Sequence, residues 1–294
     1  MTQRLFLCLA LLLFANALVF AKAPDSSSTS ATVQYMANEG LMVVHGQTKV
    51  LFDPLFRSSY GQYQLLPRAM KETLFAGAPP FDGIDAVFVS HYHGDHFSPE
   101  DILRLLKEQP GIHLYAPIQA VNGLRKVASA QDETIFERVT AVELAYKDAP
   151  VTLEMEGLII EAVRIPHSGW PTGRLDVENI SWRVTLNENT TVLHMGDADP
   201  NDVHFERDAA YWAKRHTHLA FPPYWFFSST AGNGILQNRI KPDHSVGVHV
   251  PTSVSKIPNL RAVELRGYDL FTEPGEKREI PASALLGVEE TVEK

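Results

Sequence analysis

Four potential metal ligands lie within six residues of this chain, and no other feature of the sequence restricts its fold as much. They form the motif His91-Tyr92-His93-Gly94-Asp95-His96, which directly follows an apolar, β-branched segment at residues 86–90 that predicts a buried strand. The first two histidines are spaced i, i+2, so in an extended segment they point the same way and can face one ion. The glycine then allows a sharp turn that brings the last two ligands to the same place. The sequence therefore predicts a metal site at the end of a strand.

The first half of the chain predicts strands that lead into alternating helices and strands. Asp53-Pro54 ends a meander of hairpins, because proline cannot continue a strand ladder. Residues 55–80 are rich in proline, glycine and aromatics and predict a long irregular loop. The strands are expected at 32–37, 41–45, 49–52, 86–90 and 112–115, and the helices at 98–109 and 118–128.

The second half repeats this order of strands followed by helices. Two similar halves of this kind predict two sheets that face each other, with helices on the outside. The expected strands are 141–144, 151–155, 158–165, 180–186, 191–195, 219–221 and 245–250, and the expected helices are 200–214 and 230–240.

Three further ligand-type residues stand near the carboxyl ends of predicted strands, where clefts form in layered α/β folds. His167 follows the strand at 158–165, Asp197 follows the strand at 191–195, and His249 lies late in the strand at 245–250. His244 competes with His249 for the last place, but it precedes its strand rather than ending it. Together with the motif, these residues predict a site with enough ligands for two metal ions.

The N-terminus predicts an export signal. Arg4 supplies a positive charge, residues 5–20 are almost wholly apolar, and Ala21 or Ala23 completes a small-residue cleavage pattern. An uncleaved membrane anchor is the alternative, although sixteen residues are short for a membrane span. Cys8, the sole cysteine, lies inside this segment, so a mature protein would bind metal through histidine and carboxylate alone. The expected organisation is a signal peptide at 1–21, a Ser-rich linker at 22–31, one catalytic domain at 32–280 and a tail at 281–294.

Export implies a periplasmic or secreted protein with no membrane span after cleavage. The net charge is −9, and no cluster of lysines and arginines appears in the sequence. This balance argues against nucleic acid as the main partner and favours a small-molecule substrate. The sequence leaves the oligomeric state open.

At these residues the chain resembles the metallo-β-lactamase-fold hydrolase superfamily. The resemblance covers residues 33 to about 276 and rests on four runs of sequence. Within the superfamily it is most similar to the branch typified by ascorbate-phosphate lactonases and the N-acyl-phosphatidylethanolamine phospholipase D group, on Leu51-Phe52-Asp53-Pro54 and Gly196-Asp197-Ala198-Asp199. The four runs are His91-x-His93-x-Asp95-His96, Pro166-His167-Ser168-Gly169, His194-Met195-Gly196-Asp197 and Val248-His249-Val250.

The resemblance implies a four-layer αββα sandwich, an α/β (α+β) fold, with two divalent ions between the sheet edges. Zinc is the favoured metal, with manganese or iron as alternatives for a nitrogen and oxygen ligand set. The implied ligands are His91, His93 and His167 for the first ion, Asp95, His96 and His249 for the second, and Asp197 as a bridge between them.

Such a site predicts hydrolysis of a small ester, lactone or phosphodiester. Two ions that share a water make hydroxide available at neutral pH, and the second ion stabilises the developing oxyanion. Asp95, beside the nucleophile, is expected to orient it and to pass on its proton. A secreted metallo-β-lactamase and a metal-binding member of the fold without turnover are the two alternatives.

The substrate pocket is less determined by the sequence. The aromatic run at residues 222–227, together with Trp170, either walls an apolar pocket or belongs to the core. Basic residues of the long loop either bind an anionic head group or are simply solvated; they are Arg57, Arg68 and Lys71. We expect Asp199 to support Asp197. Three further histidines are expected on the surface: His204, His216 and His218.

Overall fold

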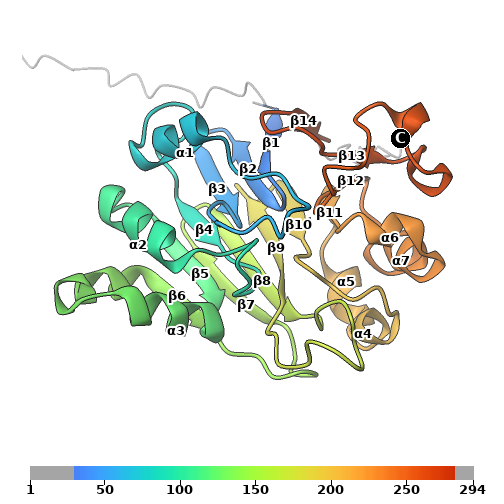
Figure 1. Ribbon diagram of the computed structural model, residues 1–294. Coiled ribbons are helices and arrows are strands. Elements are labelled where there is room, and N and C mark those ends of the chain that lie inside the picture. The colour runs from blue at the N-terminus through green and yellow to red at the C-terminus, as the bar shows by residue number, and fades with distance from the viewer. Residues whose placement is uncertain (1–29, 282–294) are drawn as a thin grey trace, which may run out of the picture.

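Two mixed sheets of seven strands each face one another in the computed structural model, which describes residues 30–281 (Figure 1). The first sheet has the order β14-β1-β2-β3-β4-β5-β6 and the second the order β13-β12-β11-β10-β9-β8-β7. The predicted signal peptide, and nearly all of the predicted linker and tail, lie outside the described residues, so those boundaries stay predictions.

The first sheet contains the strands of the first half of the chain and one strand from its far end. Its last strand in sequence, β14, pairs with its first, β1, in antiparallel fashion. The strands are β1 (Ala31–Ala37), β2 (Gly40–His45), β3 (Thr48–Phe52), β4 (Ala86–Phe88), β5 (His113–Pro117), β6 (Val139–Val142) and β14 (Lys277–Ile280).

The second sheet contains the strands of the second half and repeats the pairing pattern of the first. In each sheet three antiparallel pairings are followed by three parallel ones. The strands are β7 (Val151–Met155), β8 (Leu158–Arg164), β9 (Ile180–Leu186), β10 (Thr190–His194), β11 (Leu219–Phe221), β12 (His244–Gly247) and β13 (Asp269–Leu270).

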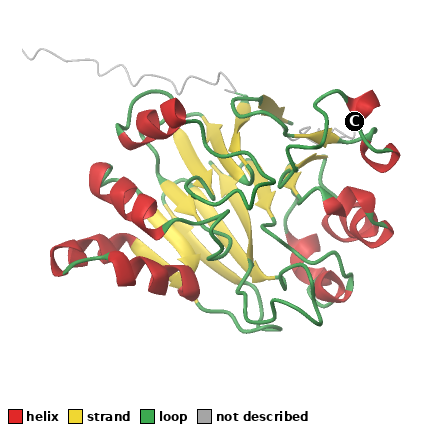
Figure 2. Cartoon of the chain, in the orientation of Figure 1, coloured by secondary structure: helices red, strands yellow, loops and turns green. Residues whose placement is uncertain are grey.

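Helices cover the outer face of each sheet (Figure 2). The first sheet is covered by α1 (Arg68–Phe75), α2 (Pro99–Glu108), α3 (Ile118–Val127) and the 3-10 helix η1 (Ala130–Arg138). Beside the second sheet lie α4 (Val203–Glu206), α5 (Ala209–Lys214), α6 (Trp225–Ser228), α7 (Thr230–Ile235), the π-helical turn η2 (Leu236–Ile240), and the 3-10 helices η3 (Pro258–Leu260) and η4 (Val263–Leu265).

Three apolar clusters separate these four layers. The cluster between the sheets joins residues of both, such as Phe52 and Phe88 from the first and Trp182 and Phe221 from the second. Each of the other two clusters lies between one sheet and its helices. The predicted four-layer αββα arrangement is thus confirmed, and its physical basis is that both faces of each sheet are buried.

Two sequence-based expectations for the elements are wrong, and one helix changes its type along its length. Residues 55–80 are not a plain loop, because α1 forms within them and buries Leu74 and Phe75. The predicted helix at 230–240 is confirmed in its bounds, as an α-helix to Ile235 that continues as a π-helical turn. The last predicted strand ends at Gly247, so His249 lies beyond it, in the left-handed backbone region with φ 55°.

Among residues 30–281, no helix is both long enough and apolar enough to cross a lipid bilayer.

Candidate metal centre

The seven predicted ligands come from segments far apart in the sequence and meet at one edge of the two sheets. The motif follows β4, His167 follows β8, Asp197 follows β10 and His249 follows β12. Parallel neighbours such as β3 and β4 end at the same edge, as do β10, β11 and β12. Strand ends from both sheets therefore supply the candidate ligands, and all seven side chains except His93 are buried.

The ligand atoms form two groups. In one, single atoms of His91, His93, His167 and Asp197 lie within 4.8 Å of one another. The second group has the same spacing and contains Asp95, His96 and His249. The arrangement matches the two sets expected from the sequence.

Asp197 lies between the groups, with one carboxylate oxygen turned to each. Its Oδ2 is 3.0 Å from Nε2 of His167 and 4.0 Å from Nε2 of His91. Its Oδ1 is 3.1 Å from Nε2 of His249 and 3.3 Å from Nε2 of His96. Two divalent ions would sit close together here, and a carboxylate between them offsets their repulsion.

A buried Asp53–Ser90 pair orients two of the histidines. Asp53 Oδ1 accepts the backbone N–H of Ser90 at 2.7 Å, and its Oδ2 accepts the Ser90 hydroxyl at 2.5 Å. The same Oδ2 is 2.8 Å from Nδ1 of His96. Because a carboxylate only accepts, His96 donates through Nδ1, which turns its Nε2 toward the site as the atom that would bind a metal. Ser90 Oγ donates its proton to Asp53 and accepts Nδ1–H of His91 at 3.0 Å. The Nε2 atom of His91 therefore also faces the site.

His167 is held in the same way by backbone. Its Nδ1 is 2.9 Å from the carbonyl oxygen of Ser168, which again leaves Nε2 free to face the site. Asp199 stabilises this loop, since its Oδ2 accepts the N–H of Gly169 at 3.1 Å, while Ser168 N–H donates to the carbonyl of Asp197 at 2.7 Å. Asp199 thus supports the His167 loop rather than the Asp197 carboxylate, which corrects the role expected from sequence.

Several inward-facing atoms make no hydrogen bond within the described residues, although they are buried. Such atoms cost free energy unless a ligand satisfies them. Burial and the neighbouring histidines lower the pKa of His93 to about 4, so at pH 7 its ring is in the neutral form that binds metal. The donor set therefore fits two divalent cations. The unbonded atoms are Asp95 Oδ1, His96 Nε2, His167 Nε2, Asp197 Oδ1 and His249 Nε2.

The charges around the second group also favour a cation. Although burial would lower it, the pKa of His96 is raised well above its usual range by Asp197 and Asp95. Burial would raise the pKa of Asp197, yet His249 and His96 hold it well below its usual range. This half of the site therefore attracts positive charge.

A glycine lets the Asp197 strand end approach the motif. Gly196 has φ 54°, and a Cβ atom there would lie 2.4 Å from Asn179 Oδ1 and 2.7 Å from Ser90 Cβ. Asn179 in turn accepts the N–H of Asp197 at 3.0 Å. A side chain at position 196 would push Asp197 away from the other ligands.

The β1–β2 turn contacts the second group from behind, a role that the sequence pattern, which indicates only a turn, does not predict. Asn38 Nδ2 donates to the carbonyl of Asp95 at 3.0 Å, and the carbonyl of Asn38 accepts the N–H of His249 at 3.1 Å. Glu39, also in this turn, is fully buried. Burial raises the pKa of Glu39 well above its usual range, against the effect of His96.

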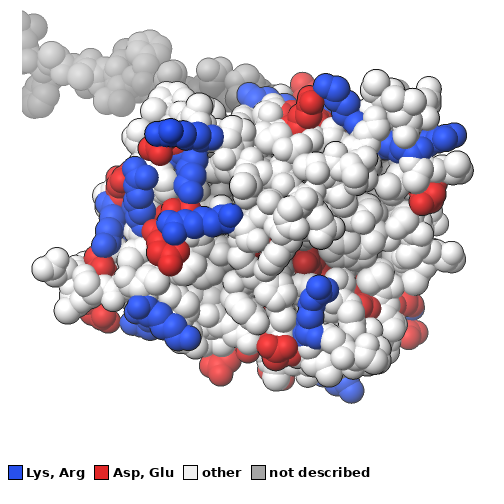
Figure 3. Space-filling view, viewed as in Figure 1, with Lys and Arg blue, Asp and Glu red and all other residues white. Residues whose placement is uncertain are grey.

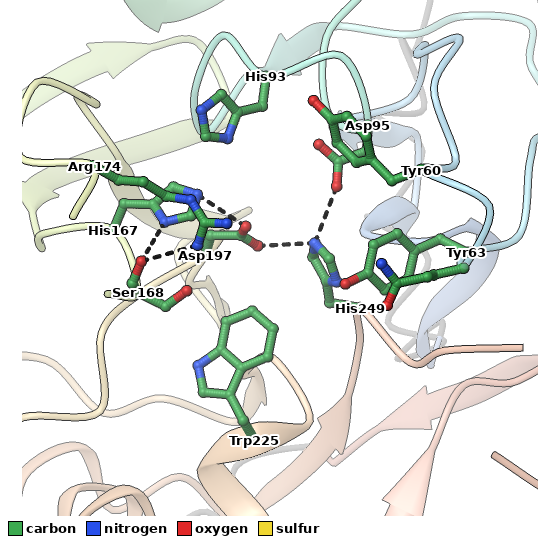
Figure 4. A pocket seen from close by; sticks show the side chains of 11 residues that line it. Tyr60, Tyr63, His93, Asp95, His167, Ser168, Arg174, Asp197, Trp225 and His249 are labelled. Carbon is green, nitrogen blue, oxygen red and sulfur yellow. Dashed lines mark hydrogen bonds and ion pairs between the residues drawn. The ribbon is translucent and has the colours of Figure 1, made fainter. Parts of the chain in front are cut away.

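A cavity of about 470 Å³ opens onto the two groups (Figure 4). In this view Tyr60 and Tyr63 lie on one side of the ligand residues, Arg174 lies on the other side near His167, and Trp225 lies below them. Arg174 is exposed and forms no ion pair among the described residues; its Nη1 donates to Ser168 O at 3.2 Å. The lining residues are Tyr60, Gln62, Tyr63, His93, Asp95, His167, Ser168, Arg174, Asp197, Trp225 and His249.

Two of the basic residues considered for an anionic head group are engaged elsewhere. Arg57 Nη2 is 2.6 Å from Asp101 Oδ1, and Lys71 contacts the other oxygen of the same carboxylate. None of Arg57, Arg68 and Lys71 lines the cavity. Figure 3 shows basic and acidic side chains intermixed over α1 and α2 on this face, rather than one basic patch.

The aromatic run serves both of the uses that the sequence left open. Trp225 lines the cavity and packs beside His249, with ring centroids 5.3 Å apart, whereas Phe226 and Phe227 are buried in the core. Trp170 does not line the cavity and packs instead against His204, at 4.8 Å.

Of the three histidines expected on the surface, only His216 is exposed. His204 is fully buried, with Nδ1 2.9 Å from the Tyr146 hydroxyl, and His218 is also buried, its Nδ1 accepting the N–H of Thr191 at 3.0 Å. The expected exposure of His204 and His218 was wrong. His204 lies in the short helix α4 and His218 directly precedes β11, and both side chains are covered by the rest of the fold.

Comparison with protein families gives one domain match. A family model described as "Beta-lactamase superfamily domain" matches residues 48–216. These residues include the motif, His167 and Asp197, but not His249.

Among curated proteins, the chain is 26% identical over 125 residues to "UPF0173 protein YddR" of Bacillus subtilis (strain 168). The match covers 38% of this chain and 48% of that protein, so the chain matches only about half the length of this relative.

Two solved structures share the fold over most of both chains. One is an isothiocyanate hydrolase from Delia radicum gut bacteria, with a TM-score of 0.56, 14% identity, and coverage of 86% of this chain and 100% of that one. The other is Igni18, a metallo hydrolase from Ignicoccus hospitalis, with a TM-score of 0.53, 15% identity, and coverage of 86% and 99%. At this identity the likeness concerns the fold.

Proposed function

Because the chain belongs to the β-lactamase superfamily, we propose that it is an exported hydrolase that uses two divalent metal ions to cleave a small ester, lactone or phosphodiester. The family membership supports hydrolysis. The number of ions, the substrate class and the export go beyond the family membership and are proposed on the observations that follow.

The position of Asp197 is the observation that supports two ions rather than one. Each of its oxygens faces a separate set of histidines, at 3.0 Å to His167 and 3.1 Å to His249. A site for one ion would need neither the second oxygen nor a second set of inward-facing nitrogens. We propose His91, His93 and His167 for one ion, Asp95, His96 and His249 for the other, and Asp197 for both.

Two bound ions would supply a hydroxide nucleophile near neutral pH and positive charge for the developing oxyanion. The chain itself orients and protects the reaction. Asp95 Oδ1 is buried without a hydrogen bond, so it can accept a proton from the attacking water. Trp225 and Tyr63, which pack against His249, restrict access of bulk water to that side.

The cavity supports a small substrate with an anionic group. Arg174 is the one cationic residue among those lining the cavity in the described part of the chain, and Tyr60 and Tyr63 add hydroxyl donors opposite to it. This favours phosphodiesters and esters that carry a carboxylate or phosphate. The resemblance to the branch of lactonases and phospholipases stays a prediction, supported by Asp53-Pro54 and Gly196-Asp197-Ala198-Asp199.

The decisive experiment is to measure metal content and turnover of the wild type and of Asp197→Ala, with a panel of phosphodiesters, anionic and neutral esters, lactones and β-lactams. We expect about two ions per wild-type chain. Asp197→Ala should hold fewer ions and lose turnover by orders of magnitude, while the fold remains. Two ions and full turnover in Asp197→Ala would disprove the bridge, and a preference for β-lactams would disprove the substrate class.

Export has a separate test. The charge and apolar run at residues 4–20, followed by Ala21 and Ala23, support cleavage. N-terminal sequencing of the mature protein should begin at Lys22 or Pro24. An intact Met1 in a soluble cytoplasmic fraction would contradict export.

A further inference from the structure

A buried carboxylate that belongs to neither ligand group lies directly behind the second group. Glu39 is fully buried in the β1–β2 turn, and neither of its carboxylate oxygens makes a hydrogen bond within the described residues. Its Oε2 is 3.3 Å from Nε2 of His194 and 3.9 Å from Nδ1 of His96. A buried carboxylate without a hydrogen bond is costly in its charged form, and a cation bound nearby would offset that cost.

The hydrogen bonds of its neighbours argue against a third ion at this place. His194 Nε2 donates to the carbonyl of Glu39 at 3.1 Å, so this nitrogen is protonated and cannot bind metal. Asp53 is already occupied by Ser90 and His96. Glu39 therefore lacks the partners that a metal site of its own would require.

An ion held by the second group would place positive charge beside Glu39. Single atoms of Glu39, His96 and Asp197 lie within 4.8 Å of one another, so the carboxylate is close to the place where that ion would bind. The same turn also holds Asp95 and His249 through Asn38. The β1–β2 turn thus contacts all three residues of the second group.

We propose that Glu39 is a positioning residue that raises the affinity for the second ion through its negative charge, without binding the ion itself. The inference rests on the proposed function, because it requires two ions. In surroundings without water, a fixed charge within about 5 Å of a ligand atom acts strongly on a divalent cation held by that atom. Partners behind a ligand commonly change metal affinity 10- to 100-fold.

The test is chelator competition with Zn²⁺ and with Mn²⁺ on the wild type, Glu39→Gln and Glu39→Asp, with His249→Ala to identify the binding step of the second ion. Glu39→Gln should raise the Kd of that step about 10- to 100-fold and leave the first step unchanged. Glu39→Asp keeps the charge on a shorter side chain, so its loss should be smaller. A loss as large as that of Glu39→Gln would indicate shape rather than charge and would overturn the proposal.

Glu161→Gln is the matched control. Glu161 is an equally buried glutamate, but it pairs with Arg183 and Arg215, each at 2.9 Å, and it belongs to neither ligand group. Glu161→Gln should lower the melting temperature of the metal-free protein and leave both metal affinities unchanged. Metal-free Glu39→Gln should melt at the wild-type temperature or above, because glutamine has the same shape and neither carboxylate oxygen of Glu39 makes a hydrogen bond within the described residues that would be lost.

The outcomes separate this inference from the proposed function. If the wild type binds two ions and Glu39→Gln binds them equally well, the inference fails and the proposed function stands. If the wild type binds fewer than two ions, the proposed function fails and the inference with it. A lower melting temperature of metal-free Glu39→Gln would show that Glu39 serves the fold and would also overturn the inference.

Discussion

Two histidines near the end of the chain, His244 and His249, were candidates for the last ligand, and their surroundings distinguish them. His249 has a buried ring whose Nε2 lies 3.1 Å from Asp197 and 3.3 Å from Asp95. The His244 side chain is 48% exposed and pairs with Asp269 at 3.4 Å, at the start of β12 rather than beyond its end. Only His249 is placed to bind metal.

His249→Ala should therefore remove the second ion and leave the first. The expected metal content falls from about two ions per chain to about one, with at least about a tenfold loss of turnover. His244→Ala is the control and should change neither quantity, as elemental analysis and steady-state rates would measure. Loss of metal in His244→Ala with none in His249→Ala would reverse the assignment.

Sequence reasoning identified ligand-type residues more easily than the groups that orient them. The motif, His167, Asp197 and His249 stand out because each follows an apolar strand. Ser90, Asn38, Glu39 and Arg174 gave no comparable signal, because their roles come from contacts across the chain. The His96–Asp53 hydrogen bond, for example, joins residues 43 positions apart.

At the scale of elements, the end of β10 depends on the glycine that brings it against the motif. Gly196→Ala should lower stability by about 1–3 kcal/mol and reduce metal content, because its Cβ would overlap Asn179 and Ser90. Gly83→Ala is the matched control, with φ 61° but nothing within 4 Å of the added Cβ. Thermal unfolding and metal analysis of both variants would separate the overlap from backbone strain alone. Equal losses in the two would refute the packing argument.

Helices α1 and α2 are joined by a charged cluster that makes the fold sensitive to acid. Burial would raise the pKa of Asp101, but hydrogen bonds from Arg57 and Lys71 lower it below its usual range. A carboxyl group whose pKa is lower in the folded than in the unfolded state stabilises the fold at any pH above its unfolded pKa, about 3.9. It loses this contribution as the pH falls through the pKa of the folded state.

Asp101→Asn should thus lower the free energy of unfolding by about 1–2 kcal/mol at pH 7 and by progressively less below about pH 4. The loss is kept this small because the Arg57 side chain is largely exposed to solvent. Urea unfolding across this pH range measures the effect. Glu133→Gln, whose side chain is 75% exposed in a pair with Arg125, should change little at any pH. A difference between Asp101→Asn and wild type that persists at pH 2 would contradict the ionic origin.

Elements with a clear apolar or alternating pattern were predicted well, and elements without one were not. The strands at 151–155, 180–186 and 219–221 match β7, β9 and β11, because each is an apolar or alternating run between turns. Helix α1 was missed because it is eight residues long, follows Pro67 and has no side-chain cap. Strand β14 was missed because its charged sequence, Lys277–Ile280, becomes a strand only by pairing with β1.

For the whole molecule, bound metal should add stability, because ligands from both halves of the chain meet only in the folded state. Metal at 100 times its Kd contributes about 2.7 kcal/mol, or about 5–10 °C in melting temperature for a domain of this size. Dialysis against a chelator, followed by calorimetry with and without added Zn²⁺, measures the shift. Asp197→Ala should show a much smaller shift, and a wild type indifferent to chelation would contradict the metal centre.

The pairing of β14 with β1 has a consequence for synthesis on the ribosome. The edge of β1 is closed only by Lys277–Ile280, and Tyr35 also exchanges backbone hydrogen bonds with Gly275 and Glu276. A growing chain would carry this edge open until almost the last described residue has left the exit tunnel, although β1 is the first of the described strands to be made. The first sheet, most of whose strands are made early, thus gains its last strand only when nearly all of the described residues have been synthesised.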